Sequence, residues 1–186
     1  MKKAYITGAT GAIGMALVGE LLKNRISTTV FLRKDSGRND RVKDSFSGEL
    51  ARGLLRIEYV SLEELSGYAL SRNTQDMKTY ASQDLLTKAA GGADTAVFYH
   101  LGWSGTFGEQ RNDADMQQKN VEYTLDAVRL AKRLGCVHFI GVGSQAEYGR
   151  FDGRLTPATR TLPENEYGRA KLAAGIRSAE LCRGLG

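Results

Sequence analysis

Thr7-Gly8-Ala9-Thr10-Gly11-Ala12-Ile13-Gly14 is the stretch that decides the fold of this chain. Its three glycines are three residues apart, after a short apolar run at residues 3–7 and at the start of a periodic apolar stretch. Gly8 permits a tight turn, Gly11 lets a pyrophosphate approach the backbone, and Gly14 lets a helix pack closely on a strand. Free N–H groups at the start of that helix favour an anion. The stretch therefore predicts a dinucleotide-binding strand–turn–helix unit rather than an ordinary turn.

Strands and helices are predicted to alternate along the rest of the chain. The predicted strands cover residues 3–7, 28–32, 54–60, 95–101 and 137–142, and the predicted helices cover about 12–24, 112–134 and 164–183, with another ending near residue 52. Residues 61–92 predict a polar surface insertion, with short helical candidates at 62–65 and 84–90. This alternation is typical of one α/β domain over residues 1–186, a Rossmann-type doubly wound parallel sheet with about five strands.

Arg33 follows the second predicted strand, where this type of fold contacts the adenosine ribose. A guanidinium group there suits the 2′-phosphate of NADP, whereas an acidic residue favours NAD. Asp35 stands two residues later and keeps NAD possible. The alternative is that these basic residues form a solvated loop with no part in cofactor binding. The sequence predicts NADP or NAD, with a preference for NADP.

Tyr167 and Lys171 are four residues apart in the last predicted helix, so their side chains share a face. A neighbouring ammonium and an oxidised nicotinamide both favour the phenolate form of a tyrosine. Tyr167 is then expected to take a proton from a sugar hydroxyl as hydride leaves the carbon, and to return it in the reverse direction. Lys171 is expected to bind the nicotinamide ribose, and Ser144, after the fifth predicted strand, to hydrogen-bond the reacting oxygen. The alternative is that Tyr167 and Lys171 form a chance pair on the surface, but their position in the helix after the fifth predicted strand argues against it.

Composition excludes several other classes of protein. The formal net charge is +5, but the basic residues are spread along the chain, which disfavours a nucleic-acid binder. The two cysteines, Cys136 and Cys182, are far apart and form no C-x-x-C motif, and the only histidines are His100 and His138, so a structural zinc site lacks ligands and no metal is expected. No apolar run is long enough for a membrane span. Reduced thiols are typical of a cytoplasmic protein, and His138 is expected in the core.

Together these motifs resemble the extended short-chain dehydrogenase/reductase family, in particular the NAD-dependent epimerase/dehydratase group that acts on nucleotide sugars. Four stretches carry the resemblance: Thr7-Gly8-x-x-Gly11-x-x-Gly14, residues 97–102 (Val-Phe-Tyr-His-Leu-Gly), residues 120–124 (Asn-Val-Glu-Tyr-Thr), and residues 143–149 (Gly-Ser-Gln-Ala-Glu-Tyr-Gly) followed by Tyr167-Gly168-x-x-Lys171. They occur in the family's order over nearly the whole chain.

The resemblance implies roles for further residues. Ala12 and Ile13 would line the pyrophosphate, Leu101 and Gly102 would lie along the cofactor, and Asn120 would support the cofactor site. Residues 103–107 would border the substrate, and His100 would be a packing residue, not a catalyst. The acidic turn that commonly touches adenine has no clear counterpart here.

The resemblance also implies that something follows Gly186 in complete relatives, namely a sixth strand and a smaller substrate domain. Their absence would expose the edge of the fifth strand, a liability to association, so a homodimer is one expected state. Two functions stay open: an NAD(P)-dependent nucleotide-sugar epimerase or ketoreductase, or a truncated, non-catalytic dinucleotide-binding module. Gln145 and Ala146 stand where dehydratases of this group tend to carry acidic residues, which disfavours a dehydratase.

Overall fold

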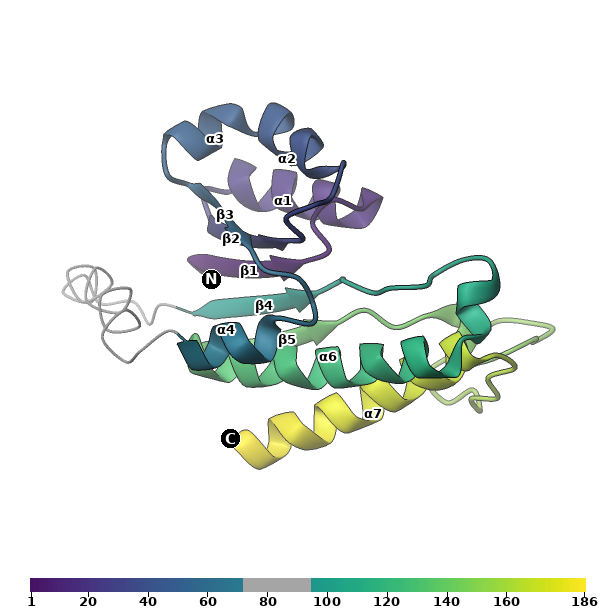
Figure 1. Cartoon of the computed structure of the whole chain (residues 1–186). Coiled ribbons are helices and arrows are strands. Elements are labelled where there is room, and N and C mark those ends of the chain that lie inside the picture. The colour runs from purple at the N-terminus through teal and green to yellow at the C-terminus, as the bar shows by residue number, and fades with distance from the viewer. Residues whose placement is uncertain (72–94) are drawn as a thin grey trace. The chain divides into compact units, whose positions relative to one another are not determined.

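The computed structural model describes residues 1–71 and 95–186, which form two compact units. The first unit comprises Met1–Gly102 and Arg129–Ile140, and the second comprises Trp103–Val128 and Gly141–Gly186. Figure 1 labels their elements along the chain. The helix predicted at 84–90 lies outside the described residues.

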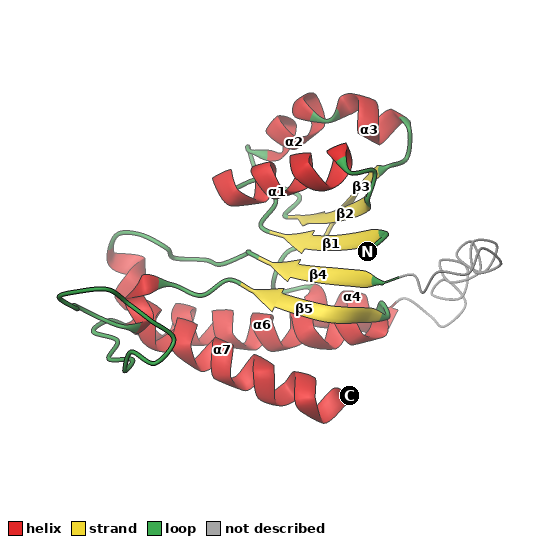
Figure 2. Ribbon diagram, turned by 180° about the vertical axis from the view of Figure 1, so that it is seen from behind, coloured by secondary structure: helices red, strands yellow, loops and turns green. Residues whose placement is uncertain are grey.

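The first unit is built on a five-stranded sheet. Its strands are β1 (Lys3–Thr7), β2 (Ser27–Leu32), β3 (Leu55–Tyr59), β4 (Ala96–His100) and β5 (Cys136–Gly141), in the order β3-β2-β1-β4-β5. β1 pairs in parallel with β2 and β4, and β2 pairs in parallel with β3. All the strand arrows run in one direction in Figure 2. The strand order reverses between β1 and β4, which is where open α/β sheets bind ligands. The predicted doubly wound parallel sheet is confirmed.

Helices cover one face of this sheet (Figures 1 and 2): α1 (Ala12–Lys23), α2 (Asn39–Ser45) and α3 (Ser47–Ala51). The core beneath them includes Ile6, Val18 and Val30, each fully buried. The other face carries a row of aromatic rings. The Phe98 ring stacks on the rings of Phe31 and Phe139, with centroid distances of 5.9 and 5.8 Å. Successive strand residues point to opposite faces, so the two faces can hold such different side chains.

Two predicted helices differ from the observed ones. The helix predicted to end near residue 52 is split at Phe46, whose φ of −129° interrupts it and whose ring packs against the core of the first unit. The helix predicted at 62–65 lies later in the chain, as α4 (Leu65–Ser71). Leu65 is buried and the Tyr68 ring meets the edge of Phe31 at 5.7 Å. Residues 65–71 are therefore part of the packed fold, not of a surface insertion.

The prediction that His138 lies in the core is wrong, because its strand, β5, is the last in the sheet order. His138 is exposed, as are its neighbours Val137 and Ile140, with 55% and 44% of their surfaces accessible. Among the described residues, β5 has a neighbouring strand on one side only. His100, by contrast, is a buried packing residue as predicted, and its ring stacks on Phe139 at 6.1 Å.

The second unit is helical. It contains most of α6 (Ala114–Arg133), all of α7 (Glu166–Leu185), and two short 3₁₀ helices, η1 (Glu109–Asn112) and η2 (Gln145–Glu147). Its core is formed by Val121, Ala170 and Ala174, and Arg177 of α7 donates to Glu122 of α6 at 3.0 Å. Within the described part of the chain, no helix is long and apolar enough to cross a membrane.

Candidate active site

The glycine-rich turn of the first unit joins β1 to α1 with its anion-binding groups open. Gly8 has a φ of +74°, and its carbonyl oxygen accepts a hydrogen bond from the Gly11 N–H at 3.2 Å. Gly11 is the N-cap of α1, without a side-chain cap, and no acidic residue stands in the first turn. Ala12 and Ile13 are exposed there, as a surface that lines a ligand would be. The first N–H groups of α1 can therefore bind a phosphate.

The three glycines of the turn have separate structural reasons. A Cβ on Gly8 would lie 2.6 Å from the Gly102 backbone nitrogen, and one on Gly14 would overlap the Gly8 carbonyl oxygen. A Cβ on Gly11 would meet only the Gly8 carbonyl oxygen, at an ordinary 3.6 Å. The fold itself thus requires glycine at positions 8 and 14. At position 11 the protein has room for a side chain, so the space is available to a ligand.

Thr7 ties the ends of β1 and β4 together beside this turn. Its hydroxyl lies 2.9 Å from the His100 Nδ1 and accepts a hydrogen bond from the Gly102 N–H at 3.2 Å. The Leu101 N–H donates to the Thr7 carbonyl oxygen at 3.2 Å. Leu101 and Gly102 are thereby held next to the glycine turn, at the point where the strand order reverses.

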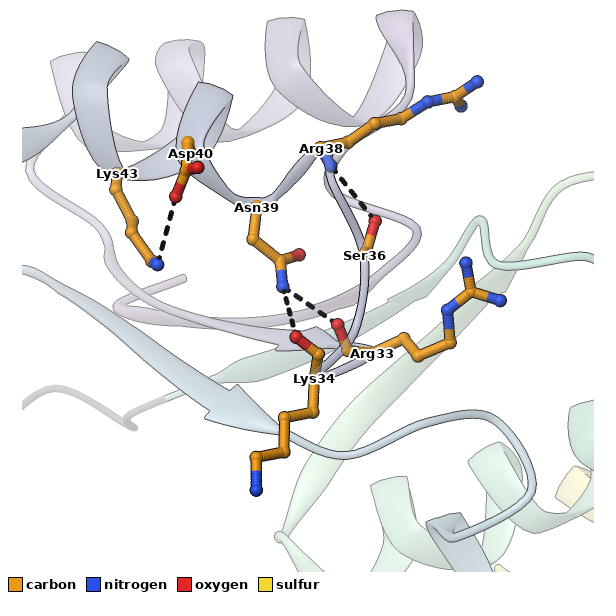
Figure 3. A network of polar contacts seen from close by, with 7 residues as sticks. All are labelled: Arg33, Lys34, Ser36, Arg38, Asn39, Asp40 and Lys43. Carbon is orange, nitrogen blue, oxygen red and sulfur yellow. Dashed lines mark hydrogen bonds and ion pairs between the residues drawn. The ribbon is translucent and has the colours of Figure 1, made fainter.

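The loop after β2 presents Arg33 to solvent, and a buried asparagine shapes it (Figure 3). The Asn39 Nδ2 donates to the carbonyl oxygens of Arg33 and Lys34, at 2.9 and 3.1 Å. The side chains of Arg33, Lys34 and Arg38 extend from the loop in different directions in Figure 3. The Arg33 guanidinium is thus exposed at the end of β2, and the Arg38 side chain, also exposed, extends in another direction (Figure 3).

Ser144 of the second unit lies three residues after β5 and caps η2. Its Oγ accepts from the Ala146 N–H at 3.2 Å, while the Glu147 Oε1 accepts from the Ser144 N–H at 2.6 Å. These reciprocal bonds form a capping box, which fixes the serine side chain. The Oγ acts there as an acceptor, so its own hydrogen can still be donated to a substrate oxygen.

Tyr167 and Lys171 stand in the first turns of α7, which packs on η2. Asn165 caps this helix by accepting from the Gly168 N–H at 2.8 Å. A Cβ on Gly168 would overlap the Ala146 carbonyl oxygen, so glycine is what allows α7 and η2 to approach closely. The structure thus places these three residues, the candidate cluster, on two elements of the second unit that pack together: Ser144 caps η2, and Tyr167 and Lys171 lie on α7.

Lys171 is almost wholly buried, with 7% of its surface accessible. Its Nζ donates to the Val142 carbonyl oxygen at 2.9 Å and lies 3.8 Å from the centroid of the Trp103 ring. Burial lowers the pKa of Lys171 from its ordinary 10.5 to about 8, and the Glu147 carboxylate partly opposes this. A lysine with such a pKa can gain or lose a proton near neutral pH, as catalytic groups do.

The segment that follows β4, from Trp103 to Arg111, packs beside this cluster. The Trp103 ring meets the Tyr167 ring edge-on at 6.0 Å, and the Arg111 guanidinium lies 4.3 Å from the centroid of Tyr167. Asn120 is buried in α6, where it accepts from the Ser104 N–H and donates to the Ser104 carbonyl oxygen, each at 2.9 Å. Asn120 therefore acts on the cluster by holding this segment in place.

The sequence motifs predict most of the residues of these sites, but they do not predict three of them. Gln117, Arg111 and Asn39 belong to no recognised pattern, and each acts through contacts between distant positions. Glu147, which follows Gln145 and Ala146, closes the capping box on Ser144. Among the described residues, no group of three or more His, Cys, Asp or Glu side chains is placed to hold a metal ion.

A Rossmann-type sheet with an open glycine turn at the start of its first helix defines the class of dinucleotide-binding α/β proteins. The model of the NAD dependent epimerase/dehydratase family matches residues 4–180. The chain belongs to this family. A search of curated proteins finds no match.

Solved structures of similar fold include sugar-nucleotide epimerases. The UDP-Glc/GlcNAc 4-epimerase of Campylobacter jejuni is 19% identical, with a TM-score of 0.73 over 99% of this chain and 50% of that one. The UDP-glucuronic acid 4-epimerase of Bacillus cereus, in complex with NAD, is 18% identical, with a TM-score of 0.68 over 98% of this chain and 52% of that one. The Bordetella bronchiseptica enzyme WbmG, in complex with NAD, is 15% identical, with a TM-score of 0.68 over 96% and 49%. This chain spans about half the length of these relatives.

Proposed function

We propose that this chain is the cofactor-binding and proton-transfer part of an NAD(P)-dependent nucleotide-sugar epimerase. The observation that carries the proposal is the packing of η2, which Ser144 caps, on α7, which carries Tyr167 and the nearly buried Lys171. Family membership and the 4-epimerases among the similar structures support a UDP-sugar as the substrate.

The residues of the first unit fit a dinucleotide. The space at Gly11 and the uncapped start of α1 suit a pyrophosphate, with Gly8, Ala12, Ile13 and Gly14 around it. Leu101 and Gly102 would lie along the cofactor, and Arg33 would meet the adenosine ribose. Asn120, which belongs to the second unit, would have a supporting role. Several similar structures hold NAD, whereas the guanidinium group of Arg33 suits the phosphate of NADP, and we propose that NADP is preferred.

A bound nicotinamide would supply hydride transfer at the sugar carbon. In this proposal Tyr167 takes the proton of the substrate hydroxyl at its phenolic oxygen, and returns a proton to the carbonyl oxygen in the reverse step. Ser144 donates a hydrogen bond to the same substrate oxygen. Lys171 binds the nicotinamide ribose and stabilises the phenolate of Tyr167 by its positive charge. The same three residues would serve both directions of the reaction, as an epimerisation requires.

A ketoreductase would use the same three residues with net consumption of reduced cofactor. A non-catalytic dinucleotide-binding module is the second candidate. It predicts cofactor binding without turnover. Free thiols at Cys136 and Cys182 agree with a reducing compartment, so we place the protein in the cytoplasm. The exposed β5 edge supports a homodimer.

The test is turnover on a panel of nucleotide sugars with NAD and NADP, followed by product analysis. We expect interconversion of 4-epimers without net cofactor reduction. In Tyr167→Phe the rate should fall at least about 100-fold, since general acid–base catalysis contributes that much. A matched control is Tyr148→Phe, at the C-cap of η2. Unchanged turnover in Tyr167→Phe would remove the proposed acid–base residue, and binding without turnover would favour the non-catalytic module.

A further inference from the structure

Trp103 occupies an unusual place in the second unit, because its ring contacts both members of the tyrosine–lysine pair. The Lys171 Nζ lies 3.8 Å from its centroid, and the Tyr167 ring meets it edge-on at 6.0 Å. An ammonium at this distance from an indole face is attracted by the negative face of the ring. Trp103 thus contacts the group that carries the positive charge and the group that would carry the proton.

The orientation of Trp103 is itself fixed by a buried side chain. The indole Nε1 donates to the Gln117 Oε1 at 2.9 Å. Gln117 has 1% of its surface accessible, and its Nε2 donates to the carbonyl oxygens of Gly105 and Gln110, at 2.8 and 2.9 Å. An amide with its donors and acceptor engaged cannot rotate freely, so the plane of the indole is set by α6.

We propose that Trp103 is a positioning residue, whose indole face holds the ammonium of Lys171 beside Tyr167 without neutralising its charge. The neutral carbonyl oxygen of Val142 also binds this ammonium, by accepting a hydrogen bond from the Lys171 Nζ at 2.9 Å. An ammonium has three donors, so one can meet Val142 and another can still reach a ligand. A carboxylate in the place of the ring would fix the lysine too, but would cancel the charge that favours the phenolate. This inference concerns the site of the proposed function and deepens it.

The groups that face this contact come from three elements. Glu147 of η2 favours the charged form of Lys171, Tyr167 precedes it on α7, and Arg111 of η1 lies over the Tyr167 ring. Burial nonetheless lowers the pKa of Lys171 to about 8. The charge against the indole is therefore expected to disappear as the pH rises through that value.

Trp103 is the only tryptophan in the chain, so tryptophan emission reports this contact alone. Emission is measured against pH on the full chain without cofactor. We expect one transition near pH 8 in the wild type. Lys171→Met should show no transition and retain the alkaline emission, whereas Lys171→Arg should retain the emission of the charged form throughout. Lys119→Met, which removes an exposed ammonium of α6, should behave like the wild type.

Tyr167→Phe separates the lysine from the tyrosine as the source of the transition, which should survive in this variant. A wild-type emission that does not change with pH, or a transition that persists in Lys171→Met, would overturn the proposal. These outcomes need no turnover, so they are independent of the failure of the proposed enzyme activity. In an active protein, Trp103→Leu should lower kcat about tenfold, the size of a cation–π contact of ordinary strength, and Trp103→Phe should restore most of it. Equal losses in both variants would contradict a role for the aromatic face.

Discussion

The Nζ of Lys171 donates a hydrogen bond to the Val142 carbonyl oxygen at 2.9 Å, in a position where only 7% of the lysine surface is accessible. The hydrogen bond ties the start of α7 to the segment that follows β5. It also holds a charge in a place where charge is costly, because burial lowers the pKa of this lysine from 10.5 to about 8. A functional arrangement thus lowers the stability of the folded chain at neutral pH.

The pH dependence of stability follows from that pKa. The unfolded chain holds the Lys171 proton up to about pH 10.5, whereas the folded chain releases it near pH 8. The cost, about 3 kcal/mol, is therefore complete below pH 8 and is relieved as the pH rises from 8 to 10.5. Lys171→Met should be more stable than the wild type at neutral pH, by about 1–2 kcal/mol after loss of the hydrogen bond. Urea unfolding at several pH values should show this advantage shrinking above pH 8, and a constant difference would contradict the lowered pKa.

Glu147 is expected to tune the pKa of Lys171. Its carboxylate raises that pKa, although burial has the larger, opposite effect. Glu147→Gln keeps an acceptor for the Ser144 N–H but removes the charge, so the pKa of Lys171 should fall below about 8. The alkaline midpoint of tryptophan emission measures the change. Glu166→Gln is a matched control, since that carboxylate pairs with Arg169 at the surface of α7 and should leave the midpoint in place.

The geometry of the glycine turn predicts that alanine substitutions at its three glycines differ in their effect on stability. Alanine at position 8 meets both a positive φ and the Gly102 backbone, and alanine at position 14 overlaps the Gly8 carbonyl. Each should lower the free energy of unfolding by about 2 kcal/mol or more. Gly11→Ala should change it by less than about 0.5 kcal/mol, since the new Cβ has ordinary contacts. Thermal unfolding distinguishes them, and equal losses at all three positions would be inconsistent with this account.

Arg33 is expected to decide the choice of cofactor. Removal of a guanidinium that pairs with the 2′-phosphate should weaken NADPH binding about tenfold or more and leave NADH binding nearly unchanged. Calorimetric titration of Arg33→Ala with both cofactors measures the two affinities. Lys34→Ala serves as the control, because its side chain extends in another direction from the same loop (Figure 3). Tighter NADH than NADPH binding in the wild type, unaffected by Arg33→Ala, would overturn the preference for NADP.

The sequence could predict the fold because local signals and topology agree in it. The glycines at positions 8, 11 and 14, with apolar stretches on either side, specify a strand–turn–helix unit that has few alternatives. His138 shows the limit of such reasoning. The sequence of its strand is typical of a buried strand, yet β5 is the last strand of the sheet among the described residues, with β4 on one side only, and His138 is exposed.

The site was predictable where a motif has fixed spacing and unpredictable where contacts join distant positions. Tyr167 and Lys171 are four residues apart, so helix geometry alone puts them on one face. Trp103 and Gln117 are fourteen residues apart, and nothing in the sequence says that the indole will accept the Lys171 ammonium on its face. Asn39 likewise reaches back six residues to shape the loop of Arg33.

Titration of the chain with NADPH and NADH tests the central claim most directly, with Gly11→Val as the variant that fills the space at the turn. We predict saturable binding to the wild type. In Gly11→Val the affinity should fall at least about tenfold, because a side chain at this position obstructs a pyrophosphate. The fold of this variant should persist, because the protein leaves room for a side chain there. Circular dichroism on the same samples verifies that the variant is folded. Failure of both cofactors to bind the folded wild-type chain would contradict the account, as would equal binding by Gly11→Val.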